Sequence, residues 1–191
     1  SNQVAFTTER YKSVVLSDTP EFYWRVNESS GTTAFDSSGN GNNGTYVNSP
    51  TLSITGSVVG SDSKGTLLNG TNQYLSGVPT TPSSLTGTWS VSLWVKPNNA
   101  ANTMTLFGTR NGSDKSFDVK FITGTSIGIN IGDGASWLVQ TTVPYTYSVG
   151  NWYHFVVVVT PTTYAIYING VNIKSSTLAG TPLLFNGTHN I

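Results

Sequence analysis

The chain of 191 residues carries nine basic and nine acidic side chains, so its formal net charge is zero and charged residues make up 9% of it. Soluble domains average about 25% charged residues, and a surface that binds nucleic acid needs clustered cations to neutralise phosphates. Because the basic residues here are few and scattered along the chain, a nucleic-acid partner is excluded, and Ser, Thr, Asn and Gly supply the polar surface.

Apolar residues make up 37% of the chain and include five Trp, nine Tyr and eight Phe, which is enough to fill the space between two sheets. The length suits one sandwich domain. The absence of Cys excludes disulfides and thiolate metal sites, so a bound metal would need oxygen ligands or the two His residues, and hard cations are the expected candidates. No stretch of about 18 apolar residues is present, and we expect no insertion into a membrane.

The first predicted element is a short helix. Thr7-Thr8-Glu9 is typical of a helix start, and Tyr11, Val14 and Val15 would share one side of the turns that follow. The periodicity then changes to two in residues 22–26, which predicts a half-buried strand.

Eight further segments are typical of short strands, because each alternates apolar and polar residues or is wholly apolar and ends at Gly, Asn, Pro or Ser. These segments are residues 67–75, 89–96, 103–110, 116–122, 126–131, 137–143, 153–160 and 164–169. Their number and spacing predict an all-β, two-sheet antiparallel sandwich. We expect residues 1–20 to be a lead-in with the short helix and residues 21–191 to form the sandwich.

Two of these segments allow finer predictions. Residues 153–159 are apolar on both faces except at His154, which predicts a central strand covered on both sides. Asn169-Gly170 follows the last segment and is the strongest two-residue hairpin signal, since both residues of a type I′ turn need positive φ.

Three stretches of the sequence carry a more specific signature. The first is Glu21-Phe-Tyr-Trp-Arg-Val-Asn-Glu28 with Ser29-Ser-Gly-Thr-Thr-Ala-Phe-Asp-Ser-Ser-Gly-Asn-Gly-Asn-Asn-Gly-Thr-Tyr46. The second is Trp89-Ser-Val-Ser-Leu-Trp-Val-Lys-Pro97, and the third is Gly150-Asn-Trp-Tyr-His-Phe-Val-Val-Val-Val159 leading into Tyr164-Ala-Ile-Tyr-Ile-Asn-Gly170. In residues, order and spacing they resemble the laminin-G-like branch of the concanavalin A-like lectin/glucanase jelly rolls, over roughly Val14 to Ile191.

The resemblance implies a jelly-roll sandwich of the kind found in phage virion and bacterial surface proteins, where a lead-in similar to residues 11–18 is common. Members of this family usually continue beyond the equivalent of Asn190-Ile191 with further strands. The resemblance therefore implies a sandwich without its last strands, incomplete at the C-terminus, whose open edge pairs with another segment.

Catalytic residues are not predicted. Glucanases of this fold use alternating carboxylates, Glu-x-Asp-x-Glu, on one strand, whereas no two of the nine carboxylates here are spaced i, i+2. His154 alternates with apolar strand neighbours and is typical of a hydrogen-bonded structural residue, and His189 stands at the chain end without a visible partner. We expect a protein that is not an enzyme.

One loop is a candidate metal site. Asp36, Asn40 and Asn42 lie in a compact Gly- and Asn-rich stretch whose oxygen atoms suit Ca²⁺, and family members often bind Ca²⁺ with loop oxygens. The same residues could instead stabilise the loop through Asx turns without any ion.

Trp137, Tyr145 and Tyr147 are candidate ligand-binding residues. They flank the Gly132–Ser136 loop and the Pro144 turn, where an aromatic platform beside polar groups could bind a sugar. Packing in the core or on a sheet face is the alternative role for these rings.

The sequence thus supports a non-catalytic recognition or decoration module of a virion or cell-surface structural protein, at an extracellular or virion surface. Its expected partners are glycans or a host surface, through adhesion, and other structural subunits of an assembly. The alternatives are the carbohydrate-binding domain of a larger secreted glycosidase and an architectural domain with no ligand.

Overall fold

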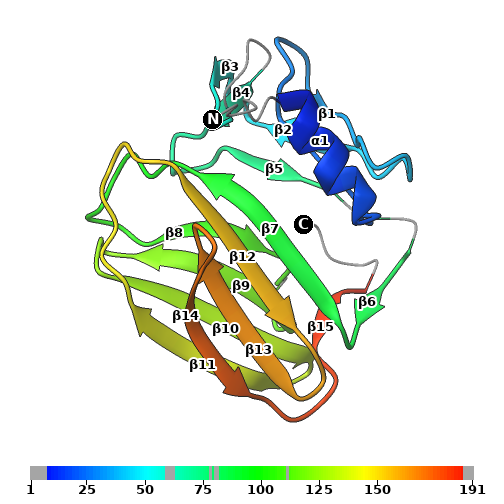
Figure 1. Cartoon of the computed structure of the whole chain (residues 1–191), viewed down its shortest axis with the longest axis vertical. Coiled ribbons are helices and arrows are strands. Elements are labelled where there is room, and N and C mark those ends of the chain that lie inside the picture. The colour runs from blue at the N-terminus through cyan, green and yellow to red at the C-terminus, as the bar shows by residue number, and fades with distance from the viewer. Residues whose placement is uncertain (1–7, 59–62, 78, 80–81, 111, 187–191) are drawn as a thin grey trace, which may run out of the picture. The chain divides into compact units, whose positions relative to one another are not determined.

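A computed structural model of the chain describes residues 8–186 except 59–62, 78, 80–81 and 111 (Figure 1). The chain forms two compact units, Ser1–Pro82 and Ser83–Ile191, which we describe separately. The boundary between these units lies after Pro82. The division into a lead-in of residues 1–20 and a sandwich of residues 21–191 stays a prediction. In the part of the chain that the structure describes, no helix has the length and apolar character needed to cross a membrane.

Among its described residues, the second unit contains strands and no helix. Met104–Gly108 (β8), Lys115–Ile122 (β9), Ser126–Gly134 (β10) and Trp137–Pro144 (β11) form one antiparallel sheet in the order β11-β10-β9-β8. Trp89–Val95 (β7), Tyr153–Val159 (β12), Thr163–Ile168 (β13) and Val171–Thr177 (β14) form another in the order β14-β13-β12-β7. Leu85–Thr86 (β6) pairs with Leu183–Phe185 (β15).

The two four-stranded sheets stack face to face, as Figure 1 shows. Aromatic rings join them: Phe121 of β9 lies edge-on to Phe155 of β12, with ring centroids 6.5 Å apart, and Phe117 of β9 lies edge-on to Trp89 of β7 at 4.9 Å. The three Phe side chains are fully buried. This arrangement confirms the predicted all-β antiparallel sandwich.

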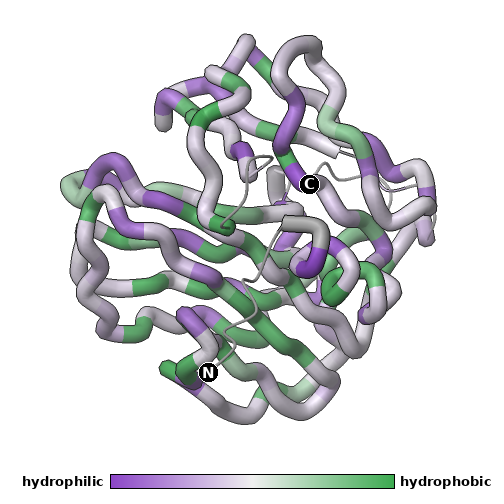
Figure 2. Tube along the Cα trace, turned by 45° about the horizontal axis from the view of Figure 1, so that its top comes forward, coloured by the Kyte–Doolittle hydropathy of each residue, from purple (hydrophilic) through white to green (hydrophobic). Residues whose placement is uncertain are grey.

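Alternation along the strands produces this core, and hydrophobic and polar positions follow one another along them in Figure 2. In β12, Phe155, Val157 and Val159 are buried between the sheets. β12 is central, between β13 and β7, as predicted. The prediction that it is covered on both faces is wrong, because the outward-facing Val158 is 37% exposed.

The predicted hairpin after β13 is confirmed. Asn169 and Gly170 have φ values of 51° and 78°, and β13 pairs antiparallel with β14 across them. The Asn169 side chain also fixes the neighbouring strand, since its Oδ1 accepts a hydrogen bond of 2.8 Å from the His154 backbone N–H.

The first unit contains the predicted helix and five short strands. Thr8–Ser17 forms α1, while Thr7 of the predicted helix start lies outside the described residues. Thr33–Ala34 (β1), Gly44–Val47 (β2) and Tyr74–Ser76 (β5) form one sheet, and Thr51–Thr55 (β3) pairs with Lys64–Leu67 (β4).

Two strand predictions in this unit are wrong. Residues 22–26 form no strand beyond a single bridge between Trp24 and Asp36, because Val26 adopts a positive φ of 50° that breaks the extended chain. The segment 67–75 is interrupted because Asn69 Oδ1 accepts hydrogen bonds from the backbone N–H groups of residues 71, 72 and 73 and folds the chain into a turn.

The seven remaining strand predictions, from residue 89 to residue 169, are confirmed to within a few residues at each end. All of them lie in the second unit, where each strand has a face directed into the core.

The core makes a prediction about stability. Phe155→Ala should lower the free energy of unfolding by about 3–5 kcal/mol, because it removes a fully buried ring and leaves a cavity. Val158→Ala, on the same strand but facing outward, is the matched control and should cost less than about 1 kcal/mol. Urea denaturation of both variants measures the difference, and equal losses would contradict this assignment of the core.

Candidate functional site

A pocket lies at one end of the β8–β11 sheet. In an antiparallel meander the end of β8, the start of β9, the end of β10 and the start of β11 meet at the same sheet end. The pocket formed there has a volume of about 260 Å³ and is lined by Arg110, Gly112, Ser113, Asp114, Lys115 and Trp137. It therefore combines residues from the β8–β9 loop with an aromatic ring at the start of β11.

The side of the pocket that carries Trp137 is held by a tight turn between β10 and β11. Asp133 Oδ1 accepts hydrogen bonds from the backbone N–H groups of Ser136 at 2.6 Å and Ala135 at 2.8 Å. These hydrogen bonds lower the pKa of Asp133, with a smaller contribution from the charge of Lys115. Asp133 therefore stays ionised and holds the turn at neutral pH.

Gly132 allows the strands to meet closely beneath this turn. The pairing of β10 with both neighbours is irregular after Ile131, and a Cβ at position 132 would clash with the Lys115 carbonyl oxygen. This close approach brings the start of β9 next to the turn, and thus Lys115 next to Trp137.

Within the pocket, the guanidinium carbon of Arg110 lies 5.6 Å from the centre of the Trp137 ring, within the range of a cation–π interaction. An indole ring, a guanidinium, a hydroxyl and a carboxylate are thus assembled around one hollow. Aromatic carbon packs against the C–H faces of sugars, and the polar groups can bind sugar hydroxyls. The chemistry of the pocket suits a hydroxyl-rich ligand.

The structure places Trp137 in this pocket but separates it from the other two predicted ligand residues. Trp137 begins β11, and Tyr145 and Tyr147 follow the other end of this strand. Eight residues at about 3.3 Å each place the two ends of the strand about 26 Å apart. Tyr147 is 4% exposed and stacks on Phe121 with ring centroids 4.1 Å apart. Tyr147 therefore packs in the core, which was the alternative to ligand binding for this residue.

Tyr145 is half-buried and packs edge-on against Tyr153, with ring centroids 6.2 Å apart. Burial, followed by the influence of Tyr153, raises the pKa of Tyr145. The three aromatic residues therefore do not form one platform.

Arg110 is the pocket residue that sequence reasoning missed. In the sequence it was one of several scattered cations, 27 positions before Trp137. The signal that could have found it is the meander itself, because pairing the predicted strands in order brings the end of segment 103–110 to the start of segment 137–143.

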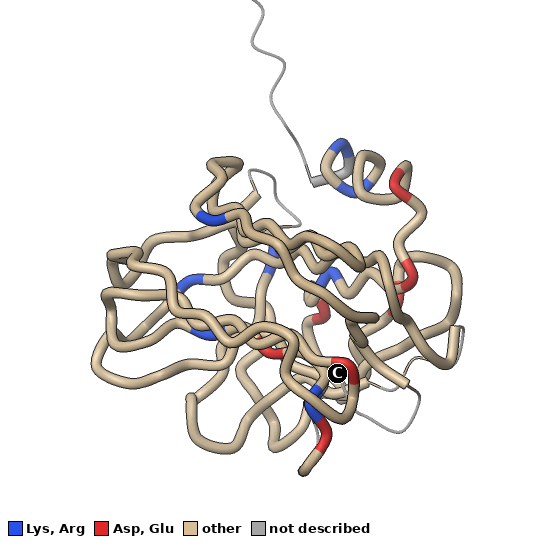
Figure 3. Tube along the Cα trace, turned by 90° about the horizontal axis from the view of Figure 1, so that it is seen from below, with Lys and Arg blue, Asp and Glu red and all other residues tan. Residues whose placement is uncertain are grey.

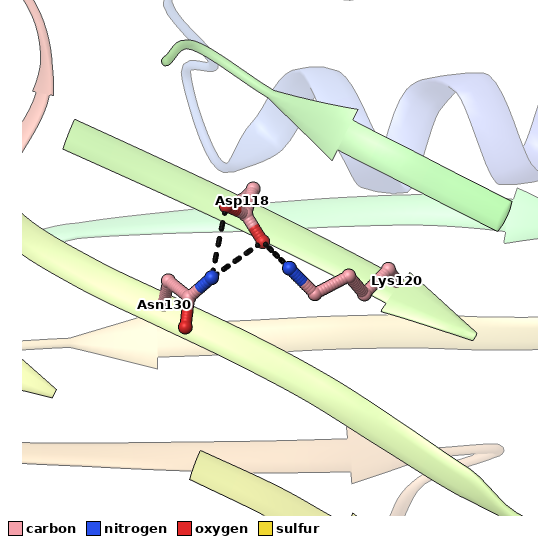
Figure 4. Close-up of polar contacts among 3 residues, drawn as sticks. All are labelled: Asp118, Lys120 and Asn130. Carbon is pink, nitrogen blue, oxygen red and sulfur yellow. Dashed lines mark hydrogen bonds and ion pairs between the residues drawn. The ribbon is translucent and has the colours of Figure 1, made fainter. Parts of the chain in front are cut away.

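A second polar cluster lies on the face of the same sheet that points away from the core (Figure 4). Asp118 Oδ1 pairs with Lys120 Nζ at 2.8 Å, and Asn130 Nδ2 of the neighbouring strand donates to both Asp118 oxygens at 3.0 Å. This carboxylate is thus held by side chains of its own sheet.

Charged residues are few along the whole trace in Figure 3. No group of three His, Cys, Asp or Glu side chains that could hold a metal occurs among the residues that the structure describes.

His154 lies on the outer face of β12. Its Nε2 is 2.8 Å from Ser92 Oγ, and its ring stacks on Trp94 with centroids 4.8 Å apart. Burial lowers the pKa of His154, which favours the neutral ring. These contacts agree with the structural role expected from the sequence, while His189 lies outside the described residues.

The Asp36 loop of the first unit is closed by its own hydrogen bonds. Asp36 Oδ1 accepts from the backbone N–H groups of Tyr23 at 2.8 Å and Ser38 at 2.9 Å. Asp36 Oδ2 accepts from Ser38 Oγ at 2.7 Å and from the backbone N–H of Asn42 at 2.9 Å. Burial raises the pKa of Asp36, but these hydrogen bonds together outweigh it and lower the pKa below its usual value.

The side-chain amides of the two Asn residues of the predicted metal site also form hydrogen bonds within the protein. Asn40 Nδ2 donates to the carbonyl of Glu21 at 3.1 Å, and Asn42 Nδ2 donates to the same carbonyl at 2.9 Å. Ca²⁺ needs six to eight oxygen ligands. Both Asp36 oxygens accept hydrogen bonds from N–H and O–H donors, which is the loop-stabilising role that was the alternative to an ion. Calcium binding stays a prediction.

Comparison with known proteins covers the second unit and part of the first. The family described as the concanavalin A-like lectin/glucanases superfamily matches residues 69–191, which is more than half of the chain. No curated protein sequence matches.

Similar solved structures share the fold. Domain 4 of AbnA, a GH43 extracellular arabinanase from Geobacillus stearothermophilus, solved in complex with arabinotriose, has a TM-score of 0.54 and 23% identity, over 81% of this chain and 74% of that one. A botulinum neurotoxin type C structure, from work on its cell entry through two ganglioside molecules, has a TM-score of 0.53 and 13% identity, over 84% of this chain. The match spans 44% of the neurotoxin chain, and both likenesses concern the fold alone.

The environment of His154 predicts a pH dependence of stability. Because folding lowers the pKa of His154, the unfolded chain binds the proton more tightly than the folded chain does. The free energy of unfolding is therefore highest above the pKa of His in the unfolded chain, about 6.5, and decreases as the pH falls below that value. Urea denaturation between pH 5.5 and 7.5 should show this loss in the wild type and a smaller one in His154→Gln. An unchanged slope in His154→Gln would contradict the prediction.

From the hydrogen bonds of the Asp36 loop we expect the stability of the protein not to depend on calcium. Asp36→Ala removes four hydrogen bonds and should lower the free energy of unfolding by about 1–3 kcal/mol, equally in calcium and in EDTA. Thermal unfolding of wild type and variant in both buffers measures this. A calcium-dependent rise in the melting temperature of the wild type, absent in Asp36→Ala, would instead support the calcium site predicted from the sequence.

Proposed function

Because the chain belongs to the concanavalin A-like lectin/glucanases superfamily, we propose that it is a non-catalytic carbohydrate-recognition module of a larger protein at a cell or virion surface. The observation that carries the proposal is the pocket in which the Trp137 ring lies beside Arg110, Ser113 and Asp114.

Two further observations support binding rather than catalysis. Glycoside hydrolysis needs an acid and a second carboxylate facing each other across the sugar. Asp114 is the one carboxylate that lines the pocket, and Asp118 on the sheet face is bound to Lys120 and Asn130. With a single lining carboxylate, the pocket lacks the usual pair of a glycosidase.

The proposed ligand and location agree with what related folds do. The arabinanase domain was solved with arabinotriose and comes from an extracellular enzyme, and the neurotoxin structure concerns ganglioside recognition. The likeness to the arabinanase domain also favours a second candidate, the carbohydrate-binding domain of a larger secreted glycosidase. Adhesion through glycans on a host surface and assembly with other structural subunits are the finer parts of the first proposal.

A glycan array tests the proposal. Wild type should bind a defined set of glycans, and Trp137→Ala should lose at least about tenfold in affinity, because stacking of a sugar on an aromatic ring supplies much of the binding energy. Trp94→Ala is the matched control, since this half-exposed Trp lies on the other sheet. Repeating the array with a chelator separates calcium-dependent binding. If wild type binds no glycan under any condition, the recognition function is wrong and an architectural role is favoured.

A further inference from the structure

The charges around the pocket indicate which kind of sugar it suits. Two cations, Arg110 and Lys115, line it, against the single carboxylate of Asp114. Nine basic residues are spread over 191 positions, so two in one pocket is a local concentration of positive charge on a nearly uncharged protein.

The two cations differ in exposure: Arg110 is exposed, whereas Lys115 at the start of β9 is half-buried. Arg110 forms no ion pair with any residue in the described part of the chain, and its contact there is with the Trp137 ring. Arg110 is therefore the group that can offer a full positive charge to a ligand.

A guanidinium has a geometry that selects for carboxylates. It is planar, stays protonated, and presents N–H donors in pairs that match the two oxygens of a carboxylate. A contact with the face of an aromatic ring involves no acceptor atom, so it leaves the N–H donors of a guanidinium available. The Trp137 ring thus lies beside an Arg110 side chain that is exposed to solvent.

The pocket is small. Pockets for whole small molecules measure roughly 300–1,000 Å³, and this one measures about 260 Å³. We therefore expect one sugar residue to lie in it, with the rest of a polysaccharide outside.

We propose that the pocket binds an acidic sugar residue, a uronic or sialic acid, whose carboxylate pairs with Arg110 while its ring packs against Trp137. The exposed Ser113 hydroxyl then binds a ring hydroxyl. The inference rests on the proposed recognition function and narrows it to carboxylate-bearing glycans.

The experiment is an array of glycans with uronic or sialic acid residues, each paired with its carboxyl-reduced neutral counterpart. Wild type should bind acidic members and not their neutral partners. Arg110→Gln should weaken this binding at least about tenfold, and Arg110→Lys should recover only part of it because it restores the charge without the planar donors. Lys174→Gln, the same loss of charge on β14 of the other sheet, is the matched control and should bind as wild type does.

The outcomes separate this inference from the function on which it rests. Binding of neutral glycans as tight as that of their acidic partners, or acidic binding that Arg110→Gln does not weaken, would overturn the acidic ligand and leave carbohydrate recognition in place. Binding of no glycan in either set would overturn the recognition function itself. Circular dichroism of each variant checks that the loss of binding is not a loss of folding.

Discussion

Packing of aromatic rings between two sheets is the interaction on which the second unit depends. The Phe121 ring contacts the rings of Tyr147, Tyr153 and Phe155. This one side chain of β9 therefore packs against the other sheet and against the segment after β11. With so few charged residues, ion pairs can contribute little, and burial of these rings together with the aliphatic side chains around them supplies most of the stabilisation.

This core also determines where a ligand can bind. Once the inward face of each strand is committed to the interior, the polar residues at the strand ends are left for solvent and ligands. The antiparallel order of β8 to β11 then brings the β8–β9 loop and the β10–β11 turn to one sheet end. Arg110 and Trp137 meet there through sheet geometry rather than through closeness in sequence.

The sequence predicted the second unit well because its strands obey a simple period. The alternation around Trp89 and Phe155 and the Asn169-Gly170 turn are local signals that tertiary structure reinforces. The first unit was predicted poorly because local side-chain bonds and backbone conformation override the pattern there. Val26 has positive φ, and Asn69 collects three backbone donors, neither of which hydrophobic periodicity registers.

The candidate site was predictable only in part for a similar reason. Trp137 could be chosen as an aromatic residue beside a Gly-rich loop, but the choice of Tyr147 missed its burial against Phe121. Whether a ring in a strand faces the core or the solvent depends on register with its neighbours, and the partner cation depends on which strands are adjacent. Both are properties of the folded sheet.

The pocket is lined by the β8–β9 loop and by Lys115 and Trp137, which begin β9 and β11, and none of these residues belongs to the buried core. Loops and strand ends at a surface can change in composition while the sheets keep their register. Selection, or a protein engineer, could therefore exchange one ligand for another by changing these few residues and leaving the core as it is.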